Sequence, residues 1–456
     1  KNPLGIDING CPLDERISEM HSLKEHGYAI GALAMIALDN PMCAGTGHRI
    51  CNDCMKGCIF QKQDPVNIPQ VETSVLTDVL NLPWGFEIYG LLTRWNPLNI
   101  DRPYALPYNG KKVMVVGLGP AGYTLSHYLL NEGFAVAGID GLKIEPFTPE
   151  MTGNENNPPI PIYNYKKEIE KELNKRVLEG FGGVSEYGIT VRWDKNFLTV
   201  LHLLLARRNT FTILDGVRFG GTITIDDAWE LGFDHIALAT GAGKPTIIDM
   251  KNNLSRGIRK ASDFLMALQL TGAAKHDSMA NLQINLPAIV IGGGLTAIDK
   301  ATEALAYYHV QVEKFVLEVD ELKLSLGENG LKSLFDREET ILTEKYYNHG
   351  KQIIAERKRA EEKGEIPDFL PLLKEWGGVK LLYRKRLQDA TAYKLNHEEV
   401  HEALEEGIEI VENMIPLEAK LDEYGAVKSV VFERTGDNTT IEFPAGSVFI
   451  AAGTSP

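Results

Sequence analysis

The sequence predicts an α/β protein in which a helical, cysteine-bearing N-terminal domain precedes two nested Rossmann-like dinucleotide-binding domains. Two observations predict the nucleotide-binding domains. Glycine fingerprints begin at Gly117 and Gly292, and each follows an apolar strand and opens a helix. A third observation sets the N-terminal part aside, because all five cysteines lie within the first 58 residues and three form the run Cys51, Cys54 and Cys58.

Length and composition agree with this architecture. A chain of 456 residues is too long for one hydrophobic core. A hydrophobic content of 44% with 24% charged residues is ordinary for a globular protein. The net charge of −15 argues against nucleic acid or an anionic membrane as a partner. We find no apolar run long enough for a membrane span and no apolar signal core, and the CxxC spacing favours metal over disulfides, so we expect a cytoplasmic protein.

Three parts are expected along the chain. Residues 1–109 show helical periodicity and no strand-rich pattern, and they end in a linker rich in Pro, Asn and Gly. Residues 110–248 and 440–456 are predicted to form the first nucleotide-binding domain, and 249–439 the second, with a charged helical insertion at 318–376. We expect the chain to continue beyond both ends, because it starts inside what reads as a folded segment and stops at a strand and turn.

The first fingerprint consists of Gly117, Gly119 and Gly122 within a βαβ unit. Gly117 permits the tight strand-to-helix turn, Gly119 lets the backbone approach a pyrophosphate, and Gly122 allows close packing of helix on strand. The helix N-terminus offers unpaired N–H groups to the phosphates. Asp140 ends the second strand, where it would accept a hydrogen bond from a ribose hydroxyl.

Neighbouring residues favour FAD at this fingerprint. Pro120 and Ala121 give the variant GPAG, which is typical of FAD sites in flavoproteins with two dinucleotide sites. Such proteins also carry a strand ending in ATG that crosses between the nucleotide domains. Thr240 and Gly241 supply that pattern here, and AAGTSP near the end of the chain adds the cofactor-binding candidates Gly453 and Thr454.

The second fingerprint is GxGxxA and follows the apolar segment PAIVI. Its cofactor-binding candidates are Gly292, Gly294, Leu295, Thr296 and Ala297. An FAD fingerprint followed by a nicotinamide fingerprint defines a nested layout, so we expect NADP or NAD at this second site.

The choice between NADP and NAD depends on the end of the next strand. If that strand is VKLLYRKR, then Arg384, Lys385 and Arg386 would hold a 2′-phosphate. If it is VQVEKFVLE, then Glu318 would suit a free 2′-hydroxyl. We favour the first strand. The basic trio is alternatively no more than a solvated strand end.

Taken together, these motifs resemble the small-subunit (β) family of glutamate synthase. That family is shared with the N-terminal half of dihydropyrimidine dehydrogenase and with the large subunit of NADH-dependent ferredoxin:NADP oxidoreductase. The matching pieces occur in the family's order over nearly the whole chain: GCPL at residues 10–13, TGHRIC with its following cysteines, DPVNIPQVE, VGLGPAG, ALATGAGKP, IGGGLTAID, YRKR followed by EEVHEALEEGI, and AAGTSP.

The resemblance implies two [4Fe–4S] clusters, which would make the N-terminal part a helical iron–sulfur domain. By position, one cluster would use Cys11, Cys51 and Cys54 together with the carboxylate of Glu72. The other would use Cys58 and three cysteines that precede the GCPL motif in the family. Thiolates from closely spaced cysteines are the usual ligands of such clusters.

Other assignments of these cysteines remain open. Cys43, Cys51, Cys54 and Cys58 would suffice for a single cluster or for one Zn²⁺. Cys43 has no place in the family pattern and is expected to be a free, buried thiol. The chain also departs from the family at Leu295, where relatives carry Asp, and in the 318–376 insertion, which would suit docking of another subunit.

The distribution of cysteines bears on electron flow. No cysteine follows Cys58, so a redox disulfide beside the flavin is excluded. The sequence therefore favours an oxidoreductase that passes electrons from NAD(P)H through FAD to the clusters, and on to a partner redox subunit or ferredoxin in a hetero-oligomeric complex. Hydride transfer demands no side-chain acid or base, so no catalytic residue is nominated. The alternative is a scaffold subunit with decayed cofactor sites, which Leu295 would support.

Overall fold

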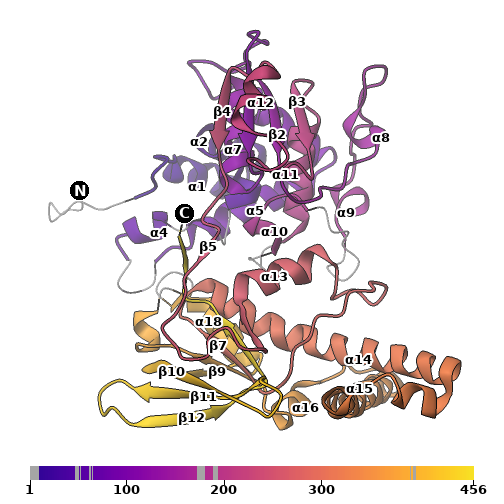
Figure 1. Cartoon of the computed structure of the whole chain (residues 1–456). Helices are drawn as coiled ribbons and strands as arrows, with labels where there is room; N and C mark the ends of the chain where they lie inside the picture. The colour runs from indigo at the N-terminus through magenta and orange to yellow at the C-terminus, as the bar shows by residue number, and fades with distance from the viewer. Residues whose placement is uncertain are drawn as a thin grey trace. The chain divides into compact units, whose positions relative to one another are not determined.

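The computed structural model describes residues 10–46, 51, 53–60, 63, 65–171, 180–187, 194–390, 392–393 and 397–455. The chain divides into two compact units, Lys1–Gly241 and Ala242–Pro456, called here the first and the second unit. Figure 1 traces both, with the first unit in indigo to magenta and the second in magenta to yellow. Each unit is described by itself.

The first unit begins with helices. They are α1 (Ile17–Glu25), α2 (Ala29–Asp39), α3 (Cys43–Thr46), α4 (Asp53–Gly57), α5 (Ile68–Leu80) and α6 (Gly85–Leu92). The side chain of Asn67 caps α5 by accepting from the backbone N–H of Gln70. Among the described residues before position 110, the only β pairing is an isolated bridge between Trp95 and Tyr104, which confirms the helical prediction.

A parallel sheet follows in the order β3-β2-β1-β4. Its strands are β1 (Lys112–Val116), β2 (Ala135–Ile139), β3 (Phe211–Leu214) and β4 (His235–Leu238). The associated helices are α7 (Pro120–Asn131), α8 (Pro149–Thr152), α9 (Tyr165–Glu168), α10 (Val184–Tyr187), α11 (Asn196–Ala206) and α12 (Ile225–Glu230). The predicted βαβ unit is therefore present as β1, α7 and β2. The predicted buried strand near residue 235 is instead the half-exposed edge strand β4.

The helical segment and the parallel sheet share one hydrophobic core. Helix α11 explains why, because it is apolar on nearly all sides and must be covered from more than one direction. Leu201 of α11 and Tyr123 of α7 both lie against Gly45 of α3. The expectation that residues 1–109 form a separate domain is thus corrected, since they pack with the sheet into one unit.

The second unit holds a parallel sheet in the order β6-β13-β7-β8-β9 and an antiparallel sheet in the order β10-β11-β12. The strands are β5 (Lys244–Pro245), β6 (Ile258–Lys260), β7 (Ala288–Ile291), β8 (Val379–Leu382), β9 (Glu409–Val411), β10 (Met414–Leu421), β11 (Val427–Arg434), β12 (Thr440–Pro444), β13 (Ser447–Ile450) and β14 (Thr454–Ser455). The helices are α13 (Ala261–Leu270), α14 (Leu295–Lys332), α15 (Arg337–Lys363), α16 (Leu370–Glu375), the 3₁₀ turn η1 (Leu387–Asp389) and α18 (His397–Glu405).

The end of the chain corrects a second expectation. Residues 440–456 were predicted to return to the first nucleotide-binding domain, but β12 and β13 belong to the sheets of the second unit. All four residues of β13 are buried, which suits a strand with a neighbour on each side. On one face Phe449 packs in a core with helices α13 and α14, and on the other Val448 packs in a core with strands β10 and β11. Strand β14 pairs with β5, also within the second unit.

The strand after the second fingerprint is β8, which pairs in parallel with β7. The segment VKLL was the favoured candidate, and this part of the prediction is confirmed. The rival segment 310–318 lies inside α14, so the alternative that placed Glu318 at a strand end is wrong. Apolar residues at helical spacing, such as Val312, Val316 and Val319, bury one face of this helix. The charged 318–376 segment is helical as predicted, although it begins in the middle of α14.

Candidate functional sites: two glycine turns and a cysteine segment

The first glycine turn lies between β1 and α7, and two of its glycines are required by the fold itself. Gly117 has φ +96°, and a Cβ there would lie 2.5 Å from the carbonyl oxygen of Ala239. A Cβ on Gly122 would lie 1.8 Å from the carbonyl oxygen of Gly117. No side chain fits at either position, so these glycines permit the turn and the packing of α7 on the sheet.

Gly119 differs from its two neighbours in the motif. It is the N-cap of α7 with φ −74° and ψ −171°, a conformation open to any residue. A Cβ there would come no closer than 3.8 Å to another atom, the Cα of Gly183. No side chain caps this helix, and Pro120 and Ala121 occupy its first turn, so its N-terminal N–H groups remain available to an anion.

Asp140 connects the end of β2 to the glycine turn. Its Oδ2 accepts from the backbone N–H of Leu118 at 3.1 Å, and its Oδ1 accepts from that of Leu142 at 3.0 Å. A carboxylate has about four lone-pair positions, so capacity remains for a ribose hydroxyl. Thr240 and Gly241 follow β4, and Gly241 has φ +68° with open space around its Cα.

A second pair of glycines, which was not predicted from the sequence, approaches the same turn. Gly182 and Gly183 have φ +103° and +54°, and a Cβ on Gly183 would lie 3.0 Å from the Cα of Gly119. The signal in the sequence was the Gly-Gly pair itself, which marks backbone that side chains cannot occupy.

The second glycine turn lies between β7 and α14. It too combines glycines that packing requires with an N-cap glycine that packing does not require. A Cβ on Gly292 would lie 2.4 Å from the carbonyl oxygen of Ala451, and one on Gly293 would meet the ring of Tyr383 at 2.2 Å. Gly294, the N-cap of α14, has φ −101° and ψ 175°, and a Cβ there would meet nothing within 4 Å. No side chain caps α14 either.

The first residues of α14 differ in how deeply they are buried. Ala297 is fully buried in the position of the third glycine and packs into the core of the unit. Leu295 packs against the same core, while Thr296 is exposed. Gly453 has φ +98°, its carbonyl accepts from the N–H of Thr246, and Thr454 pairs with β5. The structure thus brings Gly292, Gly294 and Ala297 together at one helix end.

Three basic residues follow β8, and all are exposed. The Nε of Arg386 is paired with Asp389 at 3.1 Å. The side chains of Arg384 and Lys385 have no hydrogen-bond or ion-pair partner in the part of the chain that the structure describes. Two unpaired cations at the end of the strand next to β7 are suitable for a 2′-phosphate.

The cysteine segment combines part-buried thiols with a buried carboxyl group. Burial raises the pKa of Glu72 to about 9, and a hydrogen bond with Glu15 adds to this rise. The charge of Glu72 in turn raises the pKa of Cys54 and of Cys11, after the larger effect of burial. Burial chiefly raises the pKa of Cys51, and Cys11 contributes. Glu72 therefore lies within electrostatic range of Cys11 and Cys54, and Cys51 lies within electrostatic range of Cys11 and Cys54.

These residues are not arranged as a formed metal site. Among the described residues, no group of three or more His, Cys, Asp or Glu side chains could hold a metal ion. Cys58 is a free, part-buried thiol. Cys43 is buried, as predicted, and its Sγ lies 3.5 Å from the Tyr89 hydroxyl. The thiol and carboxyl chemistry suits an iron–sulfur cluster, but ligation remains a prediction.

Comparisons with known proteins cover most of the chain. An uncharacterized protein of Rickettsia prowazekii (strain Madrid E) is 46% identical over 394 residues, covering 86% of this chain and 52% of that protein. The glutamate synthase (NADPH) small chain of Bacillus subtilis (strain 168) is 25% identical over 325 residues, covering 68% of this chain and 54% of that protein. The chain thus spans about half the length of these curated relatives.

Among solved structures, the 6-hydroxypseudooxynicotine amine oxidase of Pseudomonas geniculata N1 matches with a TM-score of 0.45 and 13% identity, covering 96% of this chain and 44% of that one. None of the helices that the structure describes has the length and apolar character needed to cross a membrane. Residues 111–456, which contain both glycine turns, match the pyridine nucleotide-disulphide oxidoreductases. The chain belongs to this family of flavin-dependent oxidoreductases, which bind FAD and NAD(P).

Proposed function

We propose that this protein is an NAD(P)H-dependent flavin and iron–sulfur oxidoreductase that passes electrons from NAD(P)H, through FAD and [4Fe–4S] clusters, to a partner redox subunit or ferredoxin. One observation carries the nucleotide part of the proposal. Gly119 and Gly294 are glycines that neither their backbone angles nor their packing requires. A bound pyrophosphate at each helix end gives both positions a reason to lack a side chain.

The residues of each turn have distinct roles in this proposal. The N–H groups at the start of α7 bind the pyrophosphate of FAD, and Asp140 holds both the turn and the adenosine ribose. The start of α14 binds the pyrophosphate of the nicotinamide nucleotide, while Arg384 and Lys385 hold a 2′-phosphate, which favours NADPH. Bound FAD supplies the chemistry that converts a hydride into single electrons.

The route by which electrons leave follows from the cysteines. Residues 111–456, which match the family, contain no cysteine, so they do not supply the disulfide that gives the family its name. Cys11, Cys51, Cys54 and Glu72 are the proposed ligands of one cluster, and Cys58 belongs to a second. Similarity to a protein named as a glutamate synthase small chain supports a partner subunit in a hetero-oligomeric complex, which we expect to be cytoplasmic.

The test is an anaerobic visible spectrum of the purified protein, titrated with NADPH and then with NADH. We expect flavin absorption with a broad iron–sulfur shoulder, both bleached by NADPH at lower concentration than by NADH. Gly119→Ala should lose flavin, and Gly294→Ala should keep flavin but resist bleaching. Gly31→Ala in α2 is the matched control, because a Cβ there makes ordinary contacts of 3.6 Å with Leu23 and Tyr28.

The outcomes separate the parts of the proposal. A folded Gly119→Ala protein that retains full flavin would contradict the assignment of the first turn. Iron and acid-labile sulfide that persist unchanged in Cys51→Ser and Cys54→Ser variants would contradict the cluster ligands. A wild-type protein that binds neither flavin nor nucleotide would leave the scaffold alternative.

A further inference from the structure

A cavity of about 250 Å³ lies in the first unit, at the edge of the parallel sheet where the strands begin. Tyr108 lines it just before β1, Gly133 just before β2, and Thr210 just before β3. The first glycine turn follows the opposite end of β1. Strands of five residues rise roughly 3.3 Å per residue, so the cavity lies roughly 15 Å from the proposed FAD phosphates. It is therefore a separate site.

Three arginines line this cavity, and only one of them is neutralised. The Nη1 of Arg207 pairs with Glu87 at 2.7 Å, and its other nitrogens donate to backbone carbonyls. Arg94 donates from Nε to the carbonyl of Gly90 at 3.1 Å, and Arg208 donates from Nη1 to Asn131. Over the described ranges, no carboxylate pairs with Arg94 or Arg208. Each guanidinium has five N–H groups, so most of these donors have no acceptor among the residues that the structure describes.

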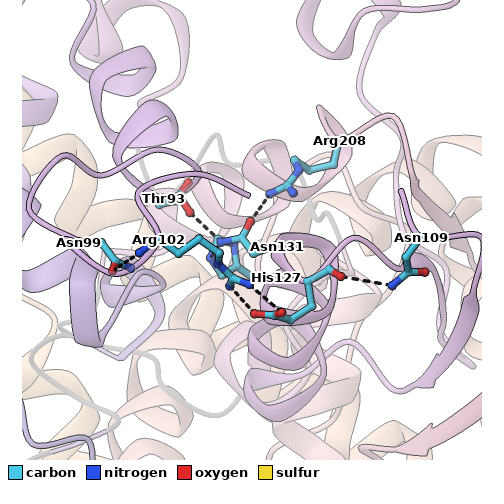
Figure 2. Close-up of polar contacts among 8 residues, drawn as sticks. Thr93, Asn99, Arg102, Asn109, His127, Asn131 and Arg208 are labelled. Carbon is cyan, nitrogen blue, oxygen red and sulfur yellow. Dashed lines mark hydrogen bonds and ion pairs between the residues drawn. The ribbon is translucent and has the colours of Figure 1, made fainter. Parts of the chain in front are cut away.

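Arg208 is held in place by a hydrogen-bond network of Asn131 and His127 on α7 and Thr93 at the end of α6, which Figure 2 shows. The Oδ1 of Asn131 accepts from Arg208 at 2.9 Å. The Nδ2 of Asn131 donates to the carbonyl of Thr93 at 3.0 Å and lies 3.2 Å from Nε2 of His127. Because the amide nitrogen is committed to these two partners, its oxygen must face Arg208. The guanidinium is therefore positioned before any ligand arrives.

The positively charged groups around the cavity repel one another. Burial and the neighbouring Arg94 lower the pKa of Arg208 to about 10. Burial and the repulsion of Arg207 lower the pKa of Arg94, although Glu87 opposes this effect. His127 is almost fully buried, and burial with the charges of Arg208 and Arg94 lowers its pKa to about 3. Arg94 is exposed and Arg208 is half-buried, so an anion bound beside them would relieve their mutual repulsion.

We propose that this cavity binds the phosphoryl group of a small phosphorylated metabolite. A phosphate monoester carries about −1.5 to −2 charges at neutral pH, which matches the two unpaired guanidinium groups. The planar fork of arginine binds phosphate oxygens in pairs. Asn209 and Thr210 add side-chain donors at the lining, and neither side chain has a hydrogen-bond partner among the described residues. The volume lies just below the range of drug-sized pockets, so the ligand is small.

The test is calorimetric titration of the FAD-loaded protein with inorganic phosphate at constant ionic strength. Arg208→Met and Arg94→Met should each weaken binding by about tenfold or more, since each removes charge-assisted hydrogen bonds. Arg102→Gln is the matched control. This change also removes one positive charge, but Arg102 is paired with Glu132 and does not line the cavity. The Arg102→Gln protein should therefore bind phosphate with the affinity of the wild type.

Three outcomes would overturn the proposal. They are a wild-type protein with no saturable phosphate binding, equal binding by the folded Arg208→Met protein, and tighter binding of succinate than of phosphate. Flavin content and thermal unfolding establish whether each variant is folded. Where Arg208→Met fails to fold, Arg208→Lys keeps the charge without the fork and should still weaken phosphate binding measurably. Phosphate that binds equally to all variants belongs to the dinucleotide sites and counts against the cavity.

Discussion

Replacing Lys300 with methionine is expected to stabilise the second unit at neutral pH. Lys300 lies on α14 with no exposed surface, and its Nζ has no hydrogen-bond partner among the described residues. The Nζ lies 3.5 Å from the ring centroid of Phe264 and 3.8 Å from that of Phe449. Burial lowers the pKa of this amine well below its ordinary value, which means that the folded protein favours the neutral form.

The change in the free energy of unfolding caused by Lys300→Met can be estimated from three contributions. A buried amine without a partner costs about 1–3 kcal/mol. Releasing its proton adds up to about 1.4 kcal/mol for each unit by which the pH lies below the ordinary pKa. Only a protonated amine would gain from the two ring contacts, by about 0.5–2 kcal/mol each, and it would then keep its proton. Methionine fills a similar volume and keeps favourable contacts with both rings, so we expect a gain of at least about 1 kcal/mol at pH 7.

The pH dependence has a definite sign. Below the ordinary pKa of 10.5 the unfolded chain binds the proton that folded Lys300 has lost, so wild-type stability rises with pH through this window. The advantage of Lys300→Met should therefore shrink between pH 7 and pH 9.5. Lys314→Met on the same helix is the control with the opposite sign, because Nζ of Lys314 donates to the carbonyls of Ala273 and Ala280.

Thermal unfolding followed by circular dichroism at both pH values measures this difference. For a unit of this size, each kcal/mol shifts the melting temperature by roughly 2–4 °C. A Lys300→Met protein that melts lower than wild type at pH 7 would refute the reasoning. It would mean that the lysine stays charged between the two rings and that the ring contacts outweigh the cost of burial.

Three further predictions concern the first unit and the nucleotide sites. Gly122→Ala should prevent flavin binding and reduce soluble yield, because its methyl group would overlap the carbonyl of Gly117. His127 is neutral when folded, so wild-type stability should fall as pH drops below 6.5, by about 2 kcal/mol at pH 5, and urea unfolding of His127→Gln should show a smaller loss. Replacing both Arg384 and Lys385 with Ala should raise the KM for NADPH about tenfold or more and leave that for NADH unchanged, measured by flavin reduction.

Local signals in the sequence were sufficient for both glycine turns. Each turn combines an apolar strand, close-spaced glycines and an amphipathic helix, and these depend only on neighbouring residues. The strand beside β7 was also identifiable, since VKLL ends in a basic run. The segment around Val312 was ambiguous because β-branched residues favour strands, and only the continued helical burial of α14 resolves it.

Long-range placement was beyond the sequence. The local sequence of β13 does not determine whether this strand pairs with β1 or with β7, because a short apolar run fits the centre of either parallel sheet. The packing of the helical segment against the first sheet likewise depends on α11. Its apolar faces predict burial, but the sequence does not say which elements cover them. The cluster of Arg94 and Arg208 joins residues more than a hundred positions apart, and no motif marks it.

The structure also separates glycines that the motif treats alike. Gly117, Gly122 and Gly292 are fixed by backbone atoms that a Cβ would strike, so these positions would need glycine in a protein that binds nothing. Gly119 and Gly294 meet no such limit, and alanine would relieve the entropy that glycine loses on folding. A scaffold with decayed sites has no reason to keep glycine at both. Their presence at two uncapped helix ends therefore argues for two working nucleotide sites.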